Sequence, residues 1–210
     1  MCGHYAAWVP AYIIRVWLPD RPGALGAVAS RVGAVRADVI GIDIIERGAG
    51  RAVDDLVIDL PDGELVDLLL AEIGEVEGVD VENIRPLSGP PPDPAVTALW
   101  VAKSVRQAGD GVEGFEALVE GALSLLSADW VALVDPTGSR IVSAAGEDVP
   151  SEGWLCAFVL GATADDSSLE LGELAVATLP DSGLALVVSR AHSPLRGREQ
   201  DVLEGLAALI

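Results

Sequence analysis

Hydrophobic and polar positions alternate in short stretches of the first half of the chain, and stretches with helical spacing separate them. Residues 12–18 place Ile14, Val16 and Leu18 on one side and Ile13, Arg15 and Trp17 on the other, which is the pattern of a β-strand. Residues 23–35 repeat apolar side chains at helical spacing, which predicts an amphipathic helix. The predicted apolar stripe comprises Leu25, Val28, Ala29, Val32 and Val35.

The same two periodicities continue to residue 87. The predicted elements are strands at residues 38–46, 52–60 and 79–87 and a helix at residues 64–75. The first of these strands places Ile40, Ile42 and Ile44 on one face. The stripe of the helix comprises Leu65, Leu68, Leu69 and Ile73. The order βαββαβ is that of a ferredoxin-like fold.

The side of this predicted sheet that faces away from the helices is charged. By the alternation, it carries Arg15, Trp17, Asp43, Asp55 and Asp59. We therefore expect this face to be solvated, or only partly covered, and an exposed Trp17 on it would mark a contact surface.

A proline-rich stretch at residues 86–94 separates the two halves of the chain. Prolines at this density prevent helices and sheet ladders and favour an extended spacer. We predict a first domain at residues 1–88, a linker at residues 89–94 and a second domain at residues 95–210.

The second half mixes helical and strand patterns in another order. The predicted elements are helices at residues 95–108, 112–127, 151–161 and 194–210 and strands at residues 129–135, 140–145, 173–179 and 184–190. Ser151 stands in the N-cap position of its helix, and Cys156 is expected to be a small buried hydrophobe. The closing helix carries Leu195, Val202, Leu203, Leu206 and Leu209. The whole chain is thus predicted to be an α+β protein.

Composition narrows the possible partners. The 210 residues carry 13 basic and 33 acidic side chains, a formal net charge of −20. Nucleic acids and anionic membranes are therefore unfavourable partners. The two cysteines, Cys2 and Cys156, are too far apart in sequence for a disulfide framework or a metal motif, and a reducing, cytoplasmic location is expected. The longest apolar run, residues 155–164, is too short to span a bilayer.

The turn between the first strand and the first helix is the candidate binding feature. Pro22 suits a first helical turn, and Gly23 leaves room above the backbone. The first N–H groups of a helix have no partner within the helix and favour an anion, so the turn could hold a carboxylate. Alternatively, the Asp20 side chain could simply cap these N–H groups.

The βαββαβ order together with the sequence DRPGAL at residues 20–25 resembles the ACT domain, a small module that binds amino acids and regulates enzymes. The resemblance covers roughly residues 11–88. It implies a homodimer that binds an amino acid at the interface between the two copies, with ligand contacts from both copies. Those contacts would come from Asp20, Arg21, Pro22, Gly23, Ala24 and Leu25 of one copy and from Asp38, Val39 and Ile40 of the other.

One position departs from the family pattern. Leu18 stands where the serine-binding members carry a histidine, which argues against serine as the ligand. Asp20 or Asp38 could accept the ammonium group through charge-assisted hydrogen bonds. The apolar residues around the turn suggest a ligand with an apolar side chain.

The second half resembles a GAF domain in its order of helix, hairpin, helix, hairpin and final helix, most closely over residues 112–210. PAS-like and profilin-like sandwiches share much of this order. The loops that build the usual GAF ligand pocket are reduced, so we expect this half to serve in dimerisation or docking.

The sequence offers little for catalysis. His4 and His192 stand at no recognisable motif spacing from a Cys or Ser, and no nucleotide-binding loop is present. We expect no catalytic residue, metal or cofactor, and a regulatory protein that senses an amino acid. The alternative is a ligand-free interaction module acting as the regulatory subunit of a biosynthetic enzyme.

Overall fold

A computed structural model describes residues 10–87, 89, 93–109, 111–164, 173–180, 182–191 and 193–209. Cys2, His4 and His192 lie outside these residues, so the expectations about them stay predictions. The chain divides into two compact units, Met1–Pro91 and Pro92–Ile210.

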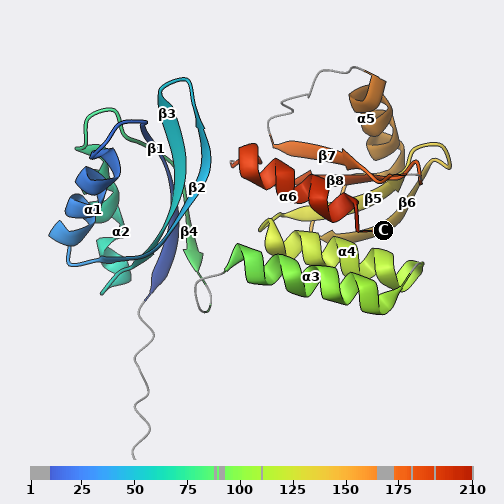
Figure 1. The fold of residues 1–210 in the computed structure, drawn as a ribbon, viewed down its shortest axis with the longest axis horizontal. Helices are drawn as coiled ribbons and strands as arrows, with labels where there is room; N and C mark the ends of the chain where they lie inside the picture. Colours follow the sequence, from blue (N-terminus) through green and yellow to red (C-terminus); the bar gives the residue numbers. More distant parts are fainter. Residues whose placement is uncertain are drawn as a thin grey trace, which may run out of the picture. The chain divides into compact units, whose positions relative to one another are not determined.

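The first unit is a four-stranded antiparallel sheet with two helices on one face (Figure 1). Its elements are β1 (Ala11–Pro19), α1 (Ala24–Ala34), β2 (Asp38–Gly48), β3 (Arg51–Asp59), a 3₁₀ turn (Gly63–Leu65), α2 (Val66–Gly74) and β4 (Asp80–Leu87). The strand order is β2-β3-β1-β4. The predicted βαββαβ order is confirmed, and the chain combines helices with two antiparallel sheets, as expected for an α+β protein.

The core of this unit forms where the apolar sides of the strands meet the two helices. Ile14, Val16 and Leu18 of β1 lie in it, as the alternation predicted. Two helical predictions were wrong: Ala29 and Leu68 are exposed. Each stripe is narrower than the apolar pattern suggested, because each helix directs only one row of side chains onto the sheet. The buried helical side chains are Ala24, Val28 and Val32 of α1 and Leu69 and Ile73 of α2.

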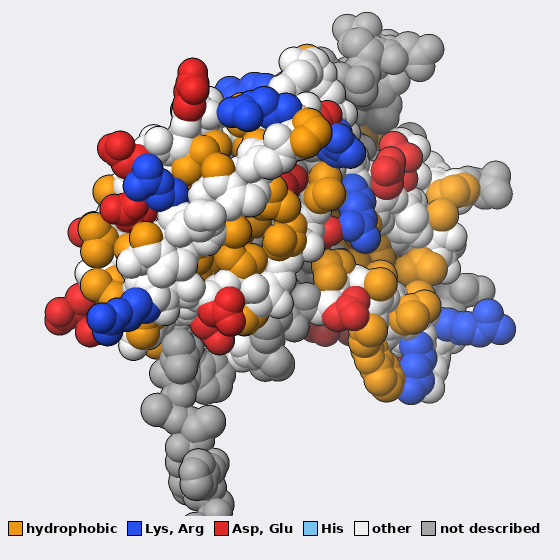
Figure 2. Space-filling model, turned by 60° about the vertical axis from the view of Figure 1, so that its left-hand side comes forward, with side chains coloured by type: hydrophobic (Ala, Val, Ile, Leu, Met, Phe, Trp, Pro, Cys, Tyr) orange, Lys and Arg blue, Asp and Glu red, His pale blue; other side chains and the backbone are white. Residues whose placement is uncertain are grey.

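Strand β2 lies at the edge of the sheet, and its isoleucines remain on the surface. Ile42 pairs with Leu56 and Ile44 with Asp54 in β3, so both lie on the side of the helices. They are nevertheless each 48% exposed. Irregular pairing interrupts β2 near Ile40 and Ile45, as is common at sheet edges. Exposed hydrophobic side chains lie among acidic and basic ones on the surface in Figure 2.

The other face of the sheet carries the predicted charged residues in register. Arg15 lies opposite Asp55, which lies opposite Asp43. The Arg15 guanidinium donates two hydrogen bonds to the Asp55 carboxylate, at 2.7 and 2.8 Å. Trp17 donates its indole N–H to Glu82 of β4. Arg15 and Asp55 are only 3% and 8% exposed, so this part of the face is less solvated than expected.

The second unit is an antiparallel sheet with helices on both faces (Figure 1). Its elements are α3 (Pro94–Ala108), α4 (Val112–Leu125), β5 (Trp130–Asp135), β6 (Arg140–Gly146), α5 (Glu152–Ala164), β7 (Leu174–Thr178), β8 (Ala185–Ser189) and α6 (Gly197–Ala207). The strand order is β6-β5-β8-β7. Alternate residues of β5 and β8 face two separate cores, one with α3, α4 and α6 and one with α5.

Local packing explains the details of this unit. Cys156 is buried in the α5 core, as predicted, and burial raises the pKa of its thiol. Leu209 was predicted in the stripe of the last helix but is exposed, because α6 ends at Ala207. A Cβ on Gly121 would lie 2.4 Å from Val101, so glycine allows the close approach of α3 and α4.

None of the helices within the described ranges is long and apolar enough to cross a membrane.

Candidate functional site

The corner between β1 and α1 forms as the sequence suggested. Strand β1 ends at Pro19, and Gly23 occupies the N-cap position of α1 with φ 89° and ψ −13°. Glycine adopts this left-handed conformation without the steric cost that a Cβ imposes. No side chain caps α1, so the positive end of this helix lacks a side-chain acceptor.

Asp20 does not cap the helix, which contradicts the capping alternative. Its carboxylate accepts a hydrogen bond from Arg47 near the end of β2, and this ion pair raises the pKa of Arg47. The Asp20 N–H donates to Gly50 O at 2.9 Å. Asp20 therefore ties the turn to the β2–β3 hairpin, and its charge is already paired.

A shallow pocket of about 220 Å³ opens at this corner. It is lined by Leu18, Pro19, Asp20, Arg21, Gly23, Leu25, Ile44, Arg47, Ala52 and Asp54. Pro22 and Ala24 do not line it. Ala24 is buried, and its N–H donates to Arg21 O at 3.3 Å. Of Gly23, Ala24 and Leu25, whose backbone was expected to meet the ligand, Gly23 and Leu25 line the pocket.

Asp54 of β3 is the group that sequence reasoning missed. It is 3% exposed, and its Oδ1 has no hydrogen-bond partner among the described residues. Burial raises the pKa of this carboxyl; the Arg47 charge lowers it, and the Asp55, Asp20 and Asp43 charges raise it further. The sequence did contain a signal. Side chains alternate between the two faces of a strand, so Asp54 lies on the same face as Leu56 and Ile58. It is therefore a carboxylate at a position that faces the core.

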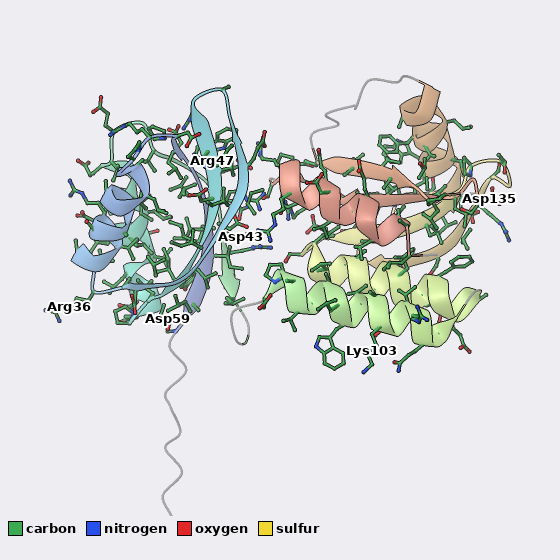
Figure 3. All side chains as sticks on the ribbon, in the orientation of Figure 1. Arg36, Asp43, Arg47, Asp59, Lys103 and Asp135 are labelled. Carbon is green, nitrogen blue, oxygen red and sulfur yellow. The ribbon has the colours of Figure 1, made fainter. Side chains whose placement is uncertain are left out.

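The second predicted set of residues lies elsewhere in the chain. Asp38 is opposite Asp59, which is opposite Ala11, whereas the corner forms where Pro19 is opposite Arg51. Arg47 and Asp59 accordingly lie at opposite ends of the sheet in Figure 3. Asp38, Val39 and Ile40 therefore cannot contact a ligand at the corner of the same chain.

The charges of the corner suit binding of a small polar molecule. Two carboxylates, two guanidinium groups and a helix N-terminus line the pocket, together with five apolar side chains. Across the described residues, no group of three or more His, Cys, Asp or Glu side chains is arranged to hold a metal ion.

The family model of the ACT domain matches residues 12–78. The predicted resemblance of this part of the chain is thereby confirmed, and residues 12–78 are an ACT domain. Such domains typically bind small-molecule ligands and dimerise, and they point to a regulatory role. A search of the curated proteins gave no match.

Several solved structures are similar to this chain or to part of it. The crystal structure of the ACT domain from the GTP pyrophosphokinase of Chlorobium tepidum is 17% identical, covers 37% of this chain and 96% of its own, and has a TM-score of 0.30. An unknown protein from Galdieria sulphuraria is 13% identical, covers 95% of this chain and 91% of its own, and has a TM-score of 0.34. A formyltetrahydrofolate deformylase from Pseudomonas putida is 15% identical, covers 46% of this chain and 38% of its own, and has a TM-score of 0.30.

Proposed function

We propose that the protein is a non-catalytic, cytoplasmic regulator that binds an amino acid through its ACT domain. Residues 1–88 form the sensing domain, and residues 89–94 link it to residues 95–210. The observation that supports this most is the uncapped N-terminus of α1 in a pocket with both charged and aliphatic walls. A helix N-terminus favours the carboxylate of the amino acid, and the aliphatic wall favours an apolar side chain.

A second copy of the chain completes the site in this proposal. The exposed isoleucines on the edge strand β2 offer an apolar surface for a homodimer. Asp38, Val39 and Ile40 would then reach the ligand of the neighbouring copy. An amino acid that binds one dimer arrangement more tightly shifts the population toward it. The GAF-like second domain would transmit this shift to a partner protein.

A thermal-shift panel of the twenty amino acids at millimolar concentration tests the proposal. A ligand present at 100 times its Kd stabilises the folded state by about 2.7 kcal/mol, which is easily measured. We expect the largest shifts from aliphatic amino acids and none from serine. A flat panel rejects amino-acid sensing.

The alternative is a ligand-free interaction module that serves as the regulatory subunit of an enzyme. Exposed Leu99 and Trp100 on α3, with Lys103 over the Trp100 ring at 4.4 Å, favour a docking role for the second unit. A stoichiometric enzyme recovered by pull-down, together with a flat amino-acid panel, would support this alternative.

A further inference from the structure

Asp54 is the least satisfied polar group in the pocket at the β1–α1 corner. Its residue surface is 3% exposed, and Oδ1 has no hydrogen-bond partner among the described residues. A buried carboxylate normally has several partners, since removing it from water without them is strongly unfavourable. A ligand that donates a hydrogen bond to Oδ1 would offset this unfavourable burial.

Pairing within the corner leaves a specific charge pattern. Asp20 and Arg47 form an ion pair, and Arg47 also acts electrostatically on Asp54 without donating a hydrogen bond to its Oδ1. The other charged groups that line the pocket are the Asp54 carboxylate, Arg21 and the positive end of α1. A zwitterion presents the complementary pair, with its carboxylate toward α1 and its ammonium group toward Asp54.

We propose that the Asp54 carboxylate accepts the α-ammonium group of the amino acid, so that both charged ends of the ligand are held within one chain. This inference rests on the proposed function and assigns a role to a residue outside the DRPGAL turn. It differs from the expectation that Asp20 or the second copy's Asp38 accepts the ammonium group. Asp20 is engaged by Arg47, and Asp38 of the second copy would contact another part of the ligand.

The aliphatic wall limits the kind of amino acid that fits. Leu18, Leu25 and Ile44 line the same pocket as Gly23 and Asp54. An amino acid with a branched aliphatic side chain would bury apolar surface there while its polar end meets the charged groups. The second copy would close the site over that side chain without supplying the ammonium contact.

The test uses the full chain, the Asp54→Asn variant and the control Asp59→Asn. Asp59 is in the same strand but on the opposite face of the sheet, so the control removes the same charge away from the pocket. Binding of L-leucine and L-valine is measured by titration calorimetry. The probes that lack the ammonium group are 4-methylpentanoate and 3-methylbutanoate.

We expect Asp54→Asn to weaken binding by about 10- to 100-fold, because a charge-assisted hydrogen bond is lost while the variant stays folded. Asp59→Asn should bind as the wild type does. The two deaminated acids should bind the wild type at least about tenfold more weakly than the amino acids, and this holds even if Asp54→Asn fails to fold.

Two results overturn the inference separately from the proposed function. One is unchanged amino-acid binding by folded Asp54→Asn, and the other is equal wild-type affinity for leucine and 4-methylpentanoate. In both cases amino-acid binding itself would stand. If none of the twenty amino acids binds the wild type, the proposed function and this inference fail together.

Discussion

Asp54 and Asp55 are neighbours in β3 that point to opposite faces of one sheet, and both are buried. Arg15 donates one hydrogen bond to each Asp55 carboxylate oxygen, and Arg85 lies 3.8 Å from Oδ2. Asp54 has an oxygen without a partner. The carboxylate with a bidentate partner contributes to the fold, whereas the one with an unsatisfied buried oxygen is destabilising unless a ligand supplies the missing donor. Proteins tolerate such groups mainly at functional sites.

The largest expected effect on stability comes from removing the hydrogen-bond partner of Asp55, Arg15. Arg15→Met keeps most of the side-chain volume but removes the bidentate partner, leaving a buried charge. We expect the free energy of unfolding of the first unit to fall by about 3 kcal/mol. Urea titration followed by hydrogen exchange of the β1 and β3 amides measures this loss in that unit alone. A loss below about 0.5 kcal/mol, typical of surface pairs, would show that the buried pair adds no stability.

A second effect concerns the turn that faces Asp54. Gly23→Ala places a Cβ on a residue with φ 89°, although no atom lies within 4 Å of the added carbon. The strain is therefore in the backbone, and we expect a loss of about 1–2 kcal/mol. Gly26→Ala is the control, because it adds the same carbon in the first turn of α1, at a residue without a positive φ, and should raise stability by about 0.5 kcal/mol. Melting temperatures that move in the same direction for both variants would contradict this account.

The two aspartates also show what the sequence could and could not predict. Alternation correctly predicted the strands, and it placed Arg15 and Asp55 on the face away from the helices. It could not predict that these two side chains meet, since a strand pattern does not specify which strands pair or in what register. The Asp20–Arg47 pair was missed for the same reason, because only the β2–β3 hairpin brings Arg47 to the turn. Asp54 was overlooked although its inward position was visible in the sequence.

Replacing Asp54 itself tests whether its charge destabilises the fold. Its pKa is raised in the folded state, so the folded protein holds this proton more tightly than the unfolded chain does. The resulting stability is present below the ordinary pKa and is lost as the pH rises through the raised value. Asp54→Asn should therefore melt a few degrees higher than the wild type at pH 7.5, and the two should converge near pH 4. Equal melting temperatures at both pH values would mean that the buried charge is already compensated.

The smallest expected effect on stability comes from giving Asp54 a partner. Ile44 lies opposite Asp54 in β2 and is 48% exposed, so Ile44→Lys places an ammonium group beside the unpaired carboxylate. The loss of partly buried apolar surface and the gain of an ion pair should leave the free energy of unfolding within about 0.5 kcal/mol of the wild type. The new charge favours the ionised carboxylate, so the raised pKa of Asp54 should fall.

Ile42→Lys is the matched control, since Ile42 has the same exposed fraction, 48%, and the same face but lies opposite Leu56. NMR titration of the Asp54 carboxyl carbon should show a lower pKa in Ile44→Lys and a much smaller change in Ile42→Lys. A lysine beside Asp54 would also occupy the position we assign to the ligand's ammonium group, so Ile44→Lys should lose amino-acid binding while remaining folded. If Ile44→Lys lowers the pKa of Asp54 and still binds the amino acid as tightly as the wild type does, the Asp54 carboxylate does not take part in ligand recognition.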